Sequence, residues 1–278
     1  MKSTIQTTIK KYQLKTSINQ EQITDVEDNI AVEAPLEIHL VYWHNQSQHK
    51  FHFTTLMRTP SLECELIYGI LYNEQIINSA QDICKIRHLG TSSSNIWRVE
   101  LTESCEFNPE SHRRNLIANS SCGICSQTEH NVNNGCSLLN QSNPISSATV
   151  FNIVNQLNSL QRLFKQTGGV HGVGLFNLSG ELIALAEDVG RHNACDKVLG
   201  SALLENLFPL NQHCLVFSGR VSFELVQKAI RCQVSVILAL GAPSSLAVEM
   251  AEQAGITLIG FIRQQSFNVY SHSWRLVE

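Results

Sequence analysis

The sequence predicts an α/β protein with a mixed sheet, and two patterns after residue 147 support that class. Residues 171–177 and 181–187 are extended stretches on either side of Leu178-Ser179-Gly180, a turn signal that predicts an antiparallel hairpin. Further along, extended and helical patterns alternate with short connections, which is typical of parallel βαβ units. The amino-terminal part shows longer extended stretches and is expected to form a smaller β-rich portion.

The amino-terminal portion is expected to begin with a polar tail. Residues 1–29 alternate polar positions and lack the apolar run of a signal sequence. The elements predicted after the tail are a hairpin of strands at 31–43 and 50–57, a short helix after the capping pair Thr59-Pro60, and a strand at 96–101. We therefore assign residues 1–29 to the tail and residues 30–103 to the β-rich portion.

Residues 147–278 are predicted to hold the α/β core. The first element is an amphipathic helix over 147–166, which ends before Gly168-Gly169. After the hairpin, the predicted elements are helices at 193–206, 223–231 and 245–254, alternating with strands at 215–218, 234–240 and 256–262. Right-handed crossovers would place these three strands in one sheet, with their carboxyl ends on the same edge.

Three turns are predicted to lie together at that edge. They are Ser218-Gly219-Arg220, Gly241-Ala242-Pro243-Ser244-Ser245 and Arg263-Gln264-Gln265-Ser266. Two of them lead into helix amino termini, where free backbone N–H groups attract anions, and Arg220 and Arg263 add positive charge. The pattern favours a pocket for a phosphate or pyrophosphate. The alternative is that the glycines only make tight turns and the arginines are solvated.

Composition bounds the environment and the partners of the chain. A formal net charge of -4 argues against a general nucleic-acid binder. No purely apolar run is longer than that at residues 236–240, which is too short to cross a bilayer, so no membrane association is expected. We expect a cytoplasmic protein, in which the nine cysteines mostly remain thiols. Their odd number and irregular spacing also disfavour a disulfide framework.

Residues 104–146 are predicted to form a mobile loop that carries a pair of cysteines. This segment is rich in Ser and Asn and shows neither helical nor strand periodicity. The pair Cys122-Gly123-Ile124-Cys125 lies within it, and two thiols at this spacing are typical of redox, metal or sulfur chemistry. The position of the pair on a loop gives it the exposure that such chemistry needs.

Several interpretations of the cysteine pair stay open. It could be incidental or a local crosslink, although its neighbours are polar. A zinc site would need two more ligands, and Cys136, His130 and His112 form no second pair of suitable spacing. A thioredoxin-like site would need a strand-to-helix junction, which the flanking sequence does not predict. A zinc deaminase would need an H-x-E motif, which the chain lacks.

Sulfur transfer is the remaining interpretation of the pair. An exposed thiolate could accept a sulfane sulfur as a persulfide, and the second thiol could stabilise or resolve it.

The charged turn at residues 187–192 is a second candidate site. Asp188, Arg191 and His192 could orient a ligand or accept a proton, or they could form a capping and ion-pair network that holds the turn. The sequence favours neither of these two alternatives. His171, after Gly168-Gly169, is expected to be a core histidine with its hydrogen bonds satisfied.

The order of several blocks resembles the formate dehydrogenase accessory sulfurtransferases, the FdhD family, from about residue 30 to residue 275. The blocks are Met57-Arg58-Thr59-Pro60, the Cys122-Gly123-Ile124-Cys125 pair, Thr167-Gly168-Gly169-Val170-His171, Glu187-Asp188-Val189-Gly190-Arg191-His192-Asn193 with Asp196-Lys197, Ser218-Gly219-Arg220 with Ser222-Phe223-Glu224, Ala242-Pro243-Ser244-Ser245-Leu246-Ala247, and Thr257-Leu258-Ile259-Gly260-Phe261. The long block that begins at Glu187 is the most specific of them. Two departures are Ser126, where glycine is common, and Gln264-Gln265, in a segment often richer in glycine.

The resemblance implies a sulfur carrier that is required for formate dehydrogenase activity. Such a protein takes sulfur from a cysteine desulfurase as a persulfide and passes it to the molybdenum bis(molybdopterin guanine dinucleotide) cofactor of formate dehydrogenase. By position, Cys122 and Cys125 match the catalytic pair, and the cofactor-binding residues are Phe261, Ile262, Arg263, Gln264, Gln265 and Ser266. The resemblance also implies a three-layer core similar to cytidine deaminase and a homodimer. The alternative function is a non-catalytic chaperone that binds and delivers the cofactor.

Overall fold

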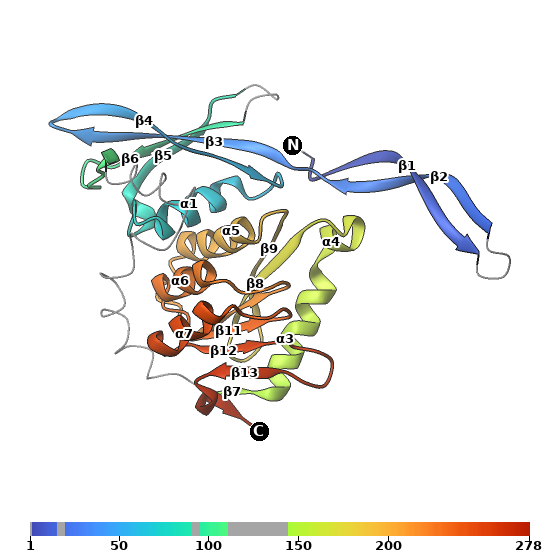
Figure 1. The fold of residues 1–278 in the computed structure, drawn as a ribbon. Helices are drawn as coiled ribbons and strands as arrows, with labels where there is room; N and C mark the ends of the chain where they lie inside the picture. Colours follow the sequence, from blue (N-terminus) through green and yellow to red (C-terminus); the bar gives the residue numbers. More distant parts are fainter. Residues whose placement is uncertain (1, 16–19, 91–94, 111–143) are drawn as a thin grey trace.

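The computed structural model describes residues 2–15, 20–90, 95–110 and 144–278. They form a mixed α/β fold with a six-stranded sheet, a four-stranded sheet and two small two-stranded sheets (Figure 1). The six-stranded sheet belongs to the carboxy-terminal portion and the four-stranded sheet to the amino-terminal portion. No helix among the described residues has the length and apolar character to cross a membrane.

The six-stranded sheet has the order β13-β12-β11-β10-β8-β9. Its strands are β8 (His171–Asn177), β9 (Leu182–Asp188), β10 (His213–Phe217), β11 (Val236–Ala239), β12 (Thr257–Gly260) and β13 (Asn268–Ser271). Strands β10, β11 and β12 pair in parallel, whereas β8 and β13 pair antiparallel with their neighbours. The mixed sheet with three parallel strands is therefore confirmed.

Helices cover both faces of this sheet. They are α3 (Ser147–Leu160), α4 (Arg162–Thr167), α5 (Arg191–Leu204), α6 (Phe223–Arg231) and α7 (Ser245–Ala254). Alternate residues of each strand point to opposite faces. Leu215 and Phe217 therefore pack with α5, α6 and α7, while Val216 packs in the core that includes α3. The core thus has three layers (Figure 1); the more specific likeness to cytidine deaminase stays a prediction.

The single helix predicted over 147–166 is wrong, because the chain breaks at Gln161 into α3 and α4. The backbone of Gln161 leaves the helical region at ψ 79°. The carboxylate of Glu187, from β9, accepts hydrogen bonds from the backbone N–H groups of Leu163 at 2.9 Å and Phe164 at 2.8 Å, and so caps the start of α4. After this change of direction the side chain of Phe164 is 47% exposed.

The amino-terminal portion is a four-stranded sheet with one helix packed on its inner face. Its elements are β3 (Ala34–His44), β4 (Ser47–Arg58), α1 (Glu63–Asn73), the short 3-10 helix η1 (Ala80–Asp82), β5 (Ile83–His88) and β6 (Ile96–Leu101). The predicted hairpin turns at Asn45-Gln46, where both residues have positive φ, as a tight two-residue hairpin turn requires. The predicted helix after Thr59-Pro60 is present as α1.

Helix α1 joins the two portions by packing closely on α5. A Cβ added at Gly69 of α1 would lie 1.9 Å from the carbonyl oxygen of Asp196, and one added at Gly200 of α5 would lie 1.8 Å from the carbonyl oxygen of Glu65. Only glycine fits at either position without moving the backbone. The two helices therefore make contact backbone to backbone, and the amino-terminal sheet is held firmly against the core.

Residues 1–29, predicted as a polar tail, contain most of two strands that were not predicted from the sequence. Strands β1 (Thr4–Lys15) and β2 (Gln20–Ala31) pair antiparallel and project from the body as an arm (Figure 1). Cross-strand pairs of apolar residues account for the register, because Ile5 lies opposite Ile30 and Ile9 lies opposite Val26. The β-branched residues of this segment favour strands, although its overall polarity suggested a tail.

The two ends of the predicted loop, residues 104–146, belong to the folded structure. Cys105 and Phe107 are buried in the core beneath the amino-terminal sheet. Ile145–Ser146 form strand β7, which pairs with β14 (Leu276–Val277). The cysteine pair Cys122-Cys125 lies outside the described residues, as do Cys136, His130 and His112.

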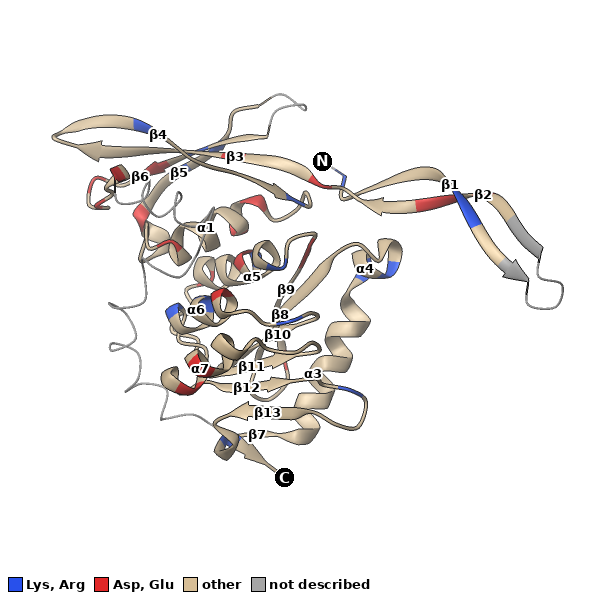
Figure 2. Cartoon of the chain, in the orientation of Figure 1, with Lys and Arg blue, Asp and Glu red and all other residues tan. Residues whose placement is uncertain are grey.

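Lys and Arg residues are distributed over both portions of the described chain (Figure 2). They do not gather into a continuous stripe in this view, and acidic residues are interspersed among them. The positive charges that bear on a ligand site are therefore local ones, set by individual turns.

Candidate functional site

The carboxyl ends of four strands meet at one edge of the six-stranded sheet. Strands β9 and β10 are both antiparallel to β8, so β9 points the same way as β10, β11 and β12. The amino termini of α5, α6 and α7 follow directly, because each helix begins after one of these strands. We call this the carboxyl edge; its segments are residues 168–171, 188–193, 218–222, 241–245 and 261–266.

Backbone hydrogen bonds join the three predicted turns to one another. The N–H of Gly241 donates to the carbonyl oxygen of Gly219 at 3.1 Å, and the N–H of Phe261 donates to that of Gly241 at 3.0 Å. A Cβ at Gly241 would lie 2.7 Å from the backbone nitrogen of Arg220, so a larger residue would push the turns apart. The prediction that these turns share one edge is confirmed, and they form one connected surface.

Three basic side chains lie at this edge: those of His171, Arg191 and Arg220. The predicted position of His171 was wrong. His171 was expected in the core but is exposed, with its ring beside Gly219: a Cβ there would lie 3.3 Å from His171 Nδ1. Partial burial, together with the positive charges of Arg191 and Arg220, lowers the pKa of His171. The imidazole is therefore mainly neutral at pH 7, and a bound anion would favour its protonation.

Two arginine side chains keep donors available at the carboxyl edge. Arg220 is exposed and makes no side-chain hydrogen bond or ion pair within the described residues. The Nε of Arg191 is buried and has no hydrogen-bond partner among them either. A buried donor without a partner costs about 1–3 kcal/mol, so an acceptor at this position would be stabilised. Donors of this kind beside helix amino termini match the oxygens of a phosphate group.

The segment predicted to bind the cofactor, residues 261–266, lies at one end of the carboxyl edge. Phe261 has φ 52° and is 42% exposed, so its ring is presented to solvent. The side chain of Ile262 instead points into the core and is only 2% exposed, which leaves only its backbone for contact with a ligand. The binding role of the segment as a whole stays a prediction.

The rest of that segment forms a turn with polar side chains at the surface. Arg263 donates from Nη1 to the carbonyl oxygens of Leu240 at 2.7 Å and Ile262 at 3.0 Å, so its guanidinium is partly engaged by the protein itself. The N–H of Arg263 donates to the carbonyl oxygen of Ser266 at 2.8 Å and closes the turn. Gln264, Gln265 and Ser266 are exposed. Arg220 is consequently better placed than Arg263 to give its charge to a ligand.

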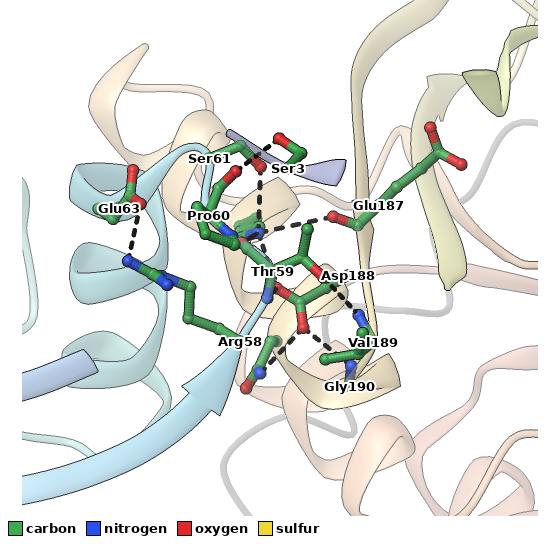
Figure 3. Close-up of polar contacts among 12 residues, drawn as sticks. Ser3, Arg58, Thr59, Pro60, Ser61, Glu63, Glu187, Asp188, Val189 and Gly190 are labelled. Atoms are coloured by element: carbon green, nitrogen blue, oxygen red, sulfur yellow. Dashed lines mark hydrogen bonds and ion pairs between the residues drawn. The ribbon is translucent and has the colours of Figure 1, made fainter. Parts of the chain in front are cut away.

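Asp188 does not reach the surface of this edge. Its side chain is fully buried and forms an ion pair of 2.7 Å with Lys197, which is also fully buried. The carboxylate also accepts hydrogen bonds from Thr59 N at 3.1 Å, Gly190 N at 2.8 Å and Asn193 Nδ2 at 3.1 Å (Figure 3). Of the two interpretations of the charged turn, the capping and ion-pair network describes Asp188, since a ligand at the surface could not contact its enclosed carboxylate.

The same network ties the core to the amino-terminal portion. Lys197 Nζ donates to the carbonyl oxygen of Thr59 at 2.8 Å, and Val189 N donates to Thr59 Oγ1 at 3.2 Å (Figure 3). Burial lowers the pKa of Lys197, but Asp188 opposes the shift and favours the charged amine. The sequence predicted only a capping role for Thr59 and no role for Lys197. Both contacts join distant parts of the chain: Thr59 lies 129 residues from Asp188 and 138 residues from Lys197.

His192 ends the charged turn in the first turn of α5, and its half-buried side chain lies beside Glu224 of α6. Its Nε2 is 3.9 Å from Glu224 Oε2, and burial lowers its pKa, so the neutral ring is favoured at pH 7.

The six described cysteines are all free thiols, and four of them are suited to packing because they are buried. Cys64 is half-buried, Cys84 is exposed, and the buried four are Cys105, Cys195, Cys214 and Cys232. Burial raises the pKa of Cys105 to about 11 and that of Cys214 to about 12, and it raises the pKa of Cys195 and Cys232 as well. Thiols held in the protonated form are poor nucleophiles. A nucleophilic role therefore falls to thiols outside this buried set.

We predict that Lys197→Met lowers the free energy of unfolding by about 3–5 kcal/mol, because it leaves the Asp188 carboxylate buried without its cation. Urea denaturation measures the change. Lys85→Met, at an exposed position on β5, is the matched control and should be nearly neutral. The double variant Asp188→Asn, Lys197→Met should recover part of the loss, since neither charge then remains. A loss below 1 kcal/mol in Lys197→Met would contradict the prediction.

We also predict that Arg220→Glu weakens the binding of pyrophosphate about ten-fold or more, because one charge-assisted hydrogen bond contributes about 1.5–3 kcal/mol and the new carboxylate repels the ligand. Isothermal titration calorimetry of the full chain measures the affinity. Arg87→Glu, an exposed arginine of the amino-terminal sheet, serves as the control. Equal affinity of Arg220→Glu and the unchanged chain, or no binding by either, would show that the carboxyl edge is not the anion site.

Comparison with known proteins agrees with the resemblance seen in the sequence. The chain matches the model of the FdhD/NarQ family over residues 31–277. It is 39% identical to the sulfur carrier protein FdhD of Sulfurisphaera tokodaii, with 90% of this chain and 92% of that protein covered, and 41% identical to the one of Sulfolobus acidocaldarius with the same coverage. A crystal structure described as a formate dehydrogenase accessory protein from Desulfotalea psychrophila is 25% identical, has a TM-score of 0.73 and covers 98% of this chain and 99% of its own. This chain is therefore a member of the FdhD/NarQ family.

Proposed function

We propose that this protein is a sulfur carrier for formate dehydrogenase that works through a persulfide on Cys122. In this proposal a cysteine desulfurase donates the sulfur, and the acceptor is the molybdenum bis(molybdopterin guanine dinucleotide) cofactor, held at the carboxyl edge. The observation that carries the proposal is the convergence of His171, Arg191 and Arg220 with three helix amino termini at that edge. The names of its relatives support the sulfur carrier role.

The carboxyl edge suits the charge of a dinucleotide. A dinucleotide carries a pyrophosphate, whose oxygens need several donors from different directions. Arg220 and Arg191 come from separate elements, and the turns at residues 218–222 and 241–245 lead into α6 and α7, whose first backbone N–H groups add donors beside them. The exposed ring of Phe261 at one end of the edge offers a surface on which a guanine base could stack.

The proposed sulfur transfer is balanced in two steps. First, the Cys122 thiolate attacks the terminal sulfur of the donor persulfide; the donor S–S bond breaks, its cysteine leaves as a thiolate, and a persulfide forms on Cys122. Second, the Cys125 thiolate attacks Cys122 Sγ, which releases hydrosulfide to the acceptor and forms a Cys122–Cys125 disulfide. The two thiols supply the two electrons that reduce the sulfane sulfur. A dithiol reductant must then restore the pair.

Burial argues against four of the other described thiols as the carrier of the sulfur, and partial burial raises the pKa of a fifth, Cys64. Cys105, Cys195, Cys214 and Cys232 are buried, so a donor protein could not reach them. Cys84 is exposed but lies on β5 of the amino-terminal sheet, away from the carboxyl edge (Figure 1). Cys84 is accordingly the natural control for a persulfide experiment.

We predict that incubation with a cysteine desulfurase and cysteine adds one reducible sulfur atom, about 32 Da, to the full chain. Intact-protein mass spectrometry measures the gain. Cys122→Ala should abolish it, and Cys84→Ala should leave it unchanged. Cys125→Ala should retain the sulfur but fail to activate formate dehydrogenase, because it lacks the resolving thiol.

Two outcomes would count against this mechanism. A gain that persists in Cys122→Ala would place the sulfur elsewhere. No gain in the unchanged chain, under conditions in which the desulfurase loads another acceptor, would favour a chaperone that only binds and delivers the cofactor. Pyrophosphate binding at the carboxyl edge would distinguish that chaperone from a protein with no cofactor site.

A further inference from the structure

A group of two histidines and one glutamate lies on the outer face of the amino-terminal sheet, apart from the carboxyl edge. It consists of Glu37 and His39 on β3 and His52 on β4. One possible ligand atom from each residue lies within 4.8 Å of the other two. We propose that this group, the His-Glu cluster, binds a divalent transition-metal ion of the Zn²⁺ type. The proposed sulfur transfer makes no use of these side chains.

Side chains along β3 point alternately to the two faces of the sheet, and this alternation places two of the three ligands on the same face. Leu36, Ile38 and Leu40 are fully buried on the inner face, so the residues between them, Glu37 and His39, point outward together. His39 Nε2 lies 2.6 Å from Glu37 Oε1. A carboxylate oxygen and an imidazole nitrogen are therefore already in contact on this face of β3.

An irregularity in the pairing of β3 with β4 supplies the third ligand. Ile38 pairs with Thr54, but the next residue, His39, pairs with His52, so β4 carries one extra residue at this point. Such a bulge changes which side chains face one another across a strand pair. Here it puts the two imidazoles directly opposite, with ring centroids 5.2 Å apart and planes at 74°.

The ligand atoms are close to the spacing that a metal ion needs. Zn²⁺ binds imidazole nitrogen and carboxylate oxygen at about 2.0–2.2 Å in a tetrahedron, which places neighbouring ligand atoms about 3.3 Å apart. Glu37 Oε1 lies 2.6 Å from His39 Nε2 and 3.8 Å from His52 Nε2, values on either side of that spacing. Small rotations of partly exposed side chains would be enough to close the site around an ion.

The ligand types select the class of ion. Two imidazoles and one carboxylate suit Zn²⁺, Cu²⁺ or Ni²⁺, whereas Ca²⁺ and Mg²⁺ prefer oxygen ligands throughout. The neighbouring strand β6 places Arg98 opposite His39. The positive charge of Arg98 repels any cation. The site therefore favours an ion that forms strong bonds to imidazole nitrogen over one held only by attraction to the Glu37 carboxylate. The fourth position of a tetrahedral ion would be filled by water.

A bound ion would link β3 to β4 and so stabilise the amino-terminal sheet. The cluster exists only when the two strands are paired in this register, so the ion would bind the folded state in preference to the unfolded chain. The hydrogen bond between Glu37 and His39 would be lost when both side chains bind the ion.

The test is a Zn²⁺ titration of the full chain against a competing chromophoric indicator. It uses a Cys122→Ser, Cys125→Ser background, because that thiol pair could bind zinc itself. The background protein should bind one Zn²⁺ through the His-Glu cluster. His39→Gln and His52→Gln should each weaken this binding at least about ten-fold, the smallest loss usually seen even for residues that only support a ligand. His49→Gln, an exposed histidine of β4 outside the cluster, should bind as the background does.

Thermal unfolding of the same proteins provides a second readout. Zn²⁺ should raise the Tm of the background protein and of His49→Gln, but not that of His39→Gln or His52→Gln. The proposal is overturned if both cluster variants bind Zn²⁺ as tightly as the background, or if the background binds none. The unfolding curves without metal show whether each variant is folded; His52 is the more exposed of the two ligands, so His52→Gln is the safer variant.

Discussion

The buried ion pair of Asp188 and Lys197 is the interaction on which the rest of the structure depends. It lies where the end of β9, the start of α5 and the segment after β4 meet, and backbone groups of Thr59 bind both charges. Removing either charge would leave the other buried without compensation. The same carboxylate holds the N–H of Gly190, the residue before α5, so the pair also fixes where Arg191 begins that helix.

This arrangement explains how a rigid edge can serve as a binding surface. The glycine contacts between α1 and α5 hold the amino-terminal portion against the core, and the linked turns at Gly219 and Gly241 hold the strand ends together. The backbone positions that carry His171 and the arginines are therefore fixed before a ligand arrives, which reduces the entropy lost on binding. The division of labour in our account follows: the edge binds the acceptor, and the cysteine pair carries the sulfur.

The sequence predicted those parts of the fold that depend on local patterns. The bounds of β6, β8, α6 and α7 agree with the predicted ranges, because strong periodicity ends there at clear turn signals. The features that were not predicted depend on contacts between distant segments. The break at Gln161 depends on Glu187, which caps α4, and the link that Lys197 makes to the amino-terminal portion depends on Thr59. His171 was misplaced because it is the first residue of β8, at the carboxyl edge, where its ring lies beside Gly219 of another strand connection. Family resemblance, rather than periodicity, pointed to residues 261–266.

Hydrogen exchange of the full chain with and without guanosine diphosphate tests the central claim most directly, since that claim is a nucleotide site at the carboxyl edge. Our account predicts slower exchange of backbone N–H groups in residues 188–193, 218–222, 241–245 and 261–266 when the nucleotide is bound. It predicts little change in β3 and β4 of the amino-terminal sheet. Unchanged exchange at the carboxyl edge at millimolar nucleotide, or protection confined to the amino-terminal sheet, would contradict it.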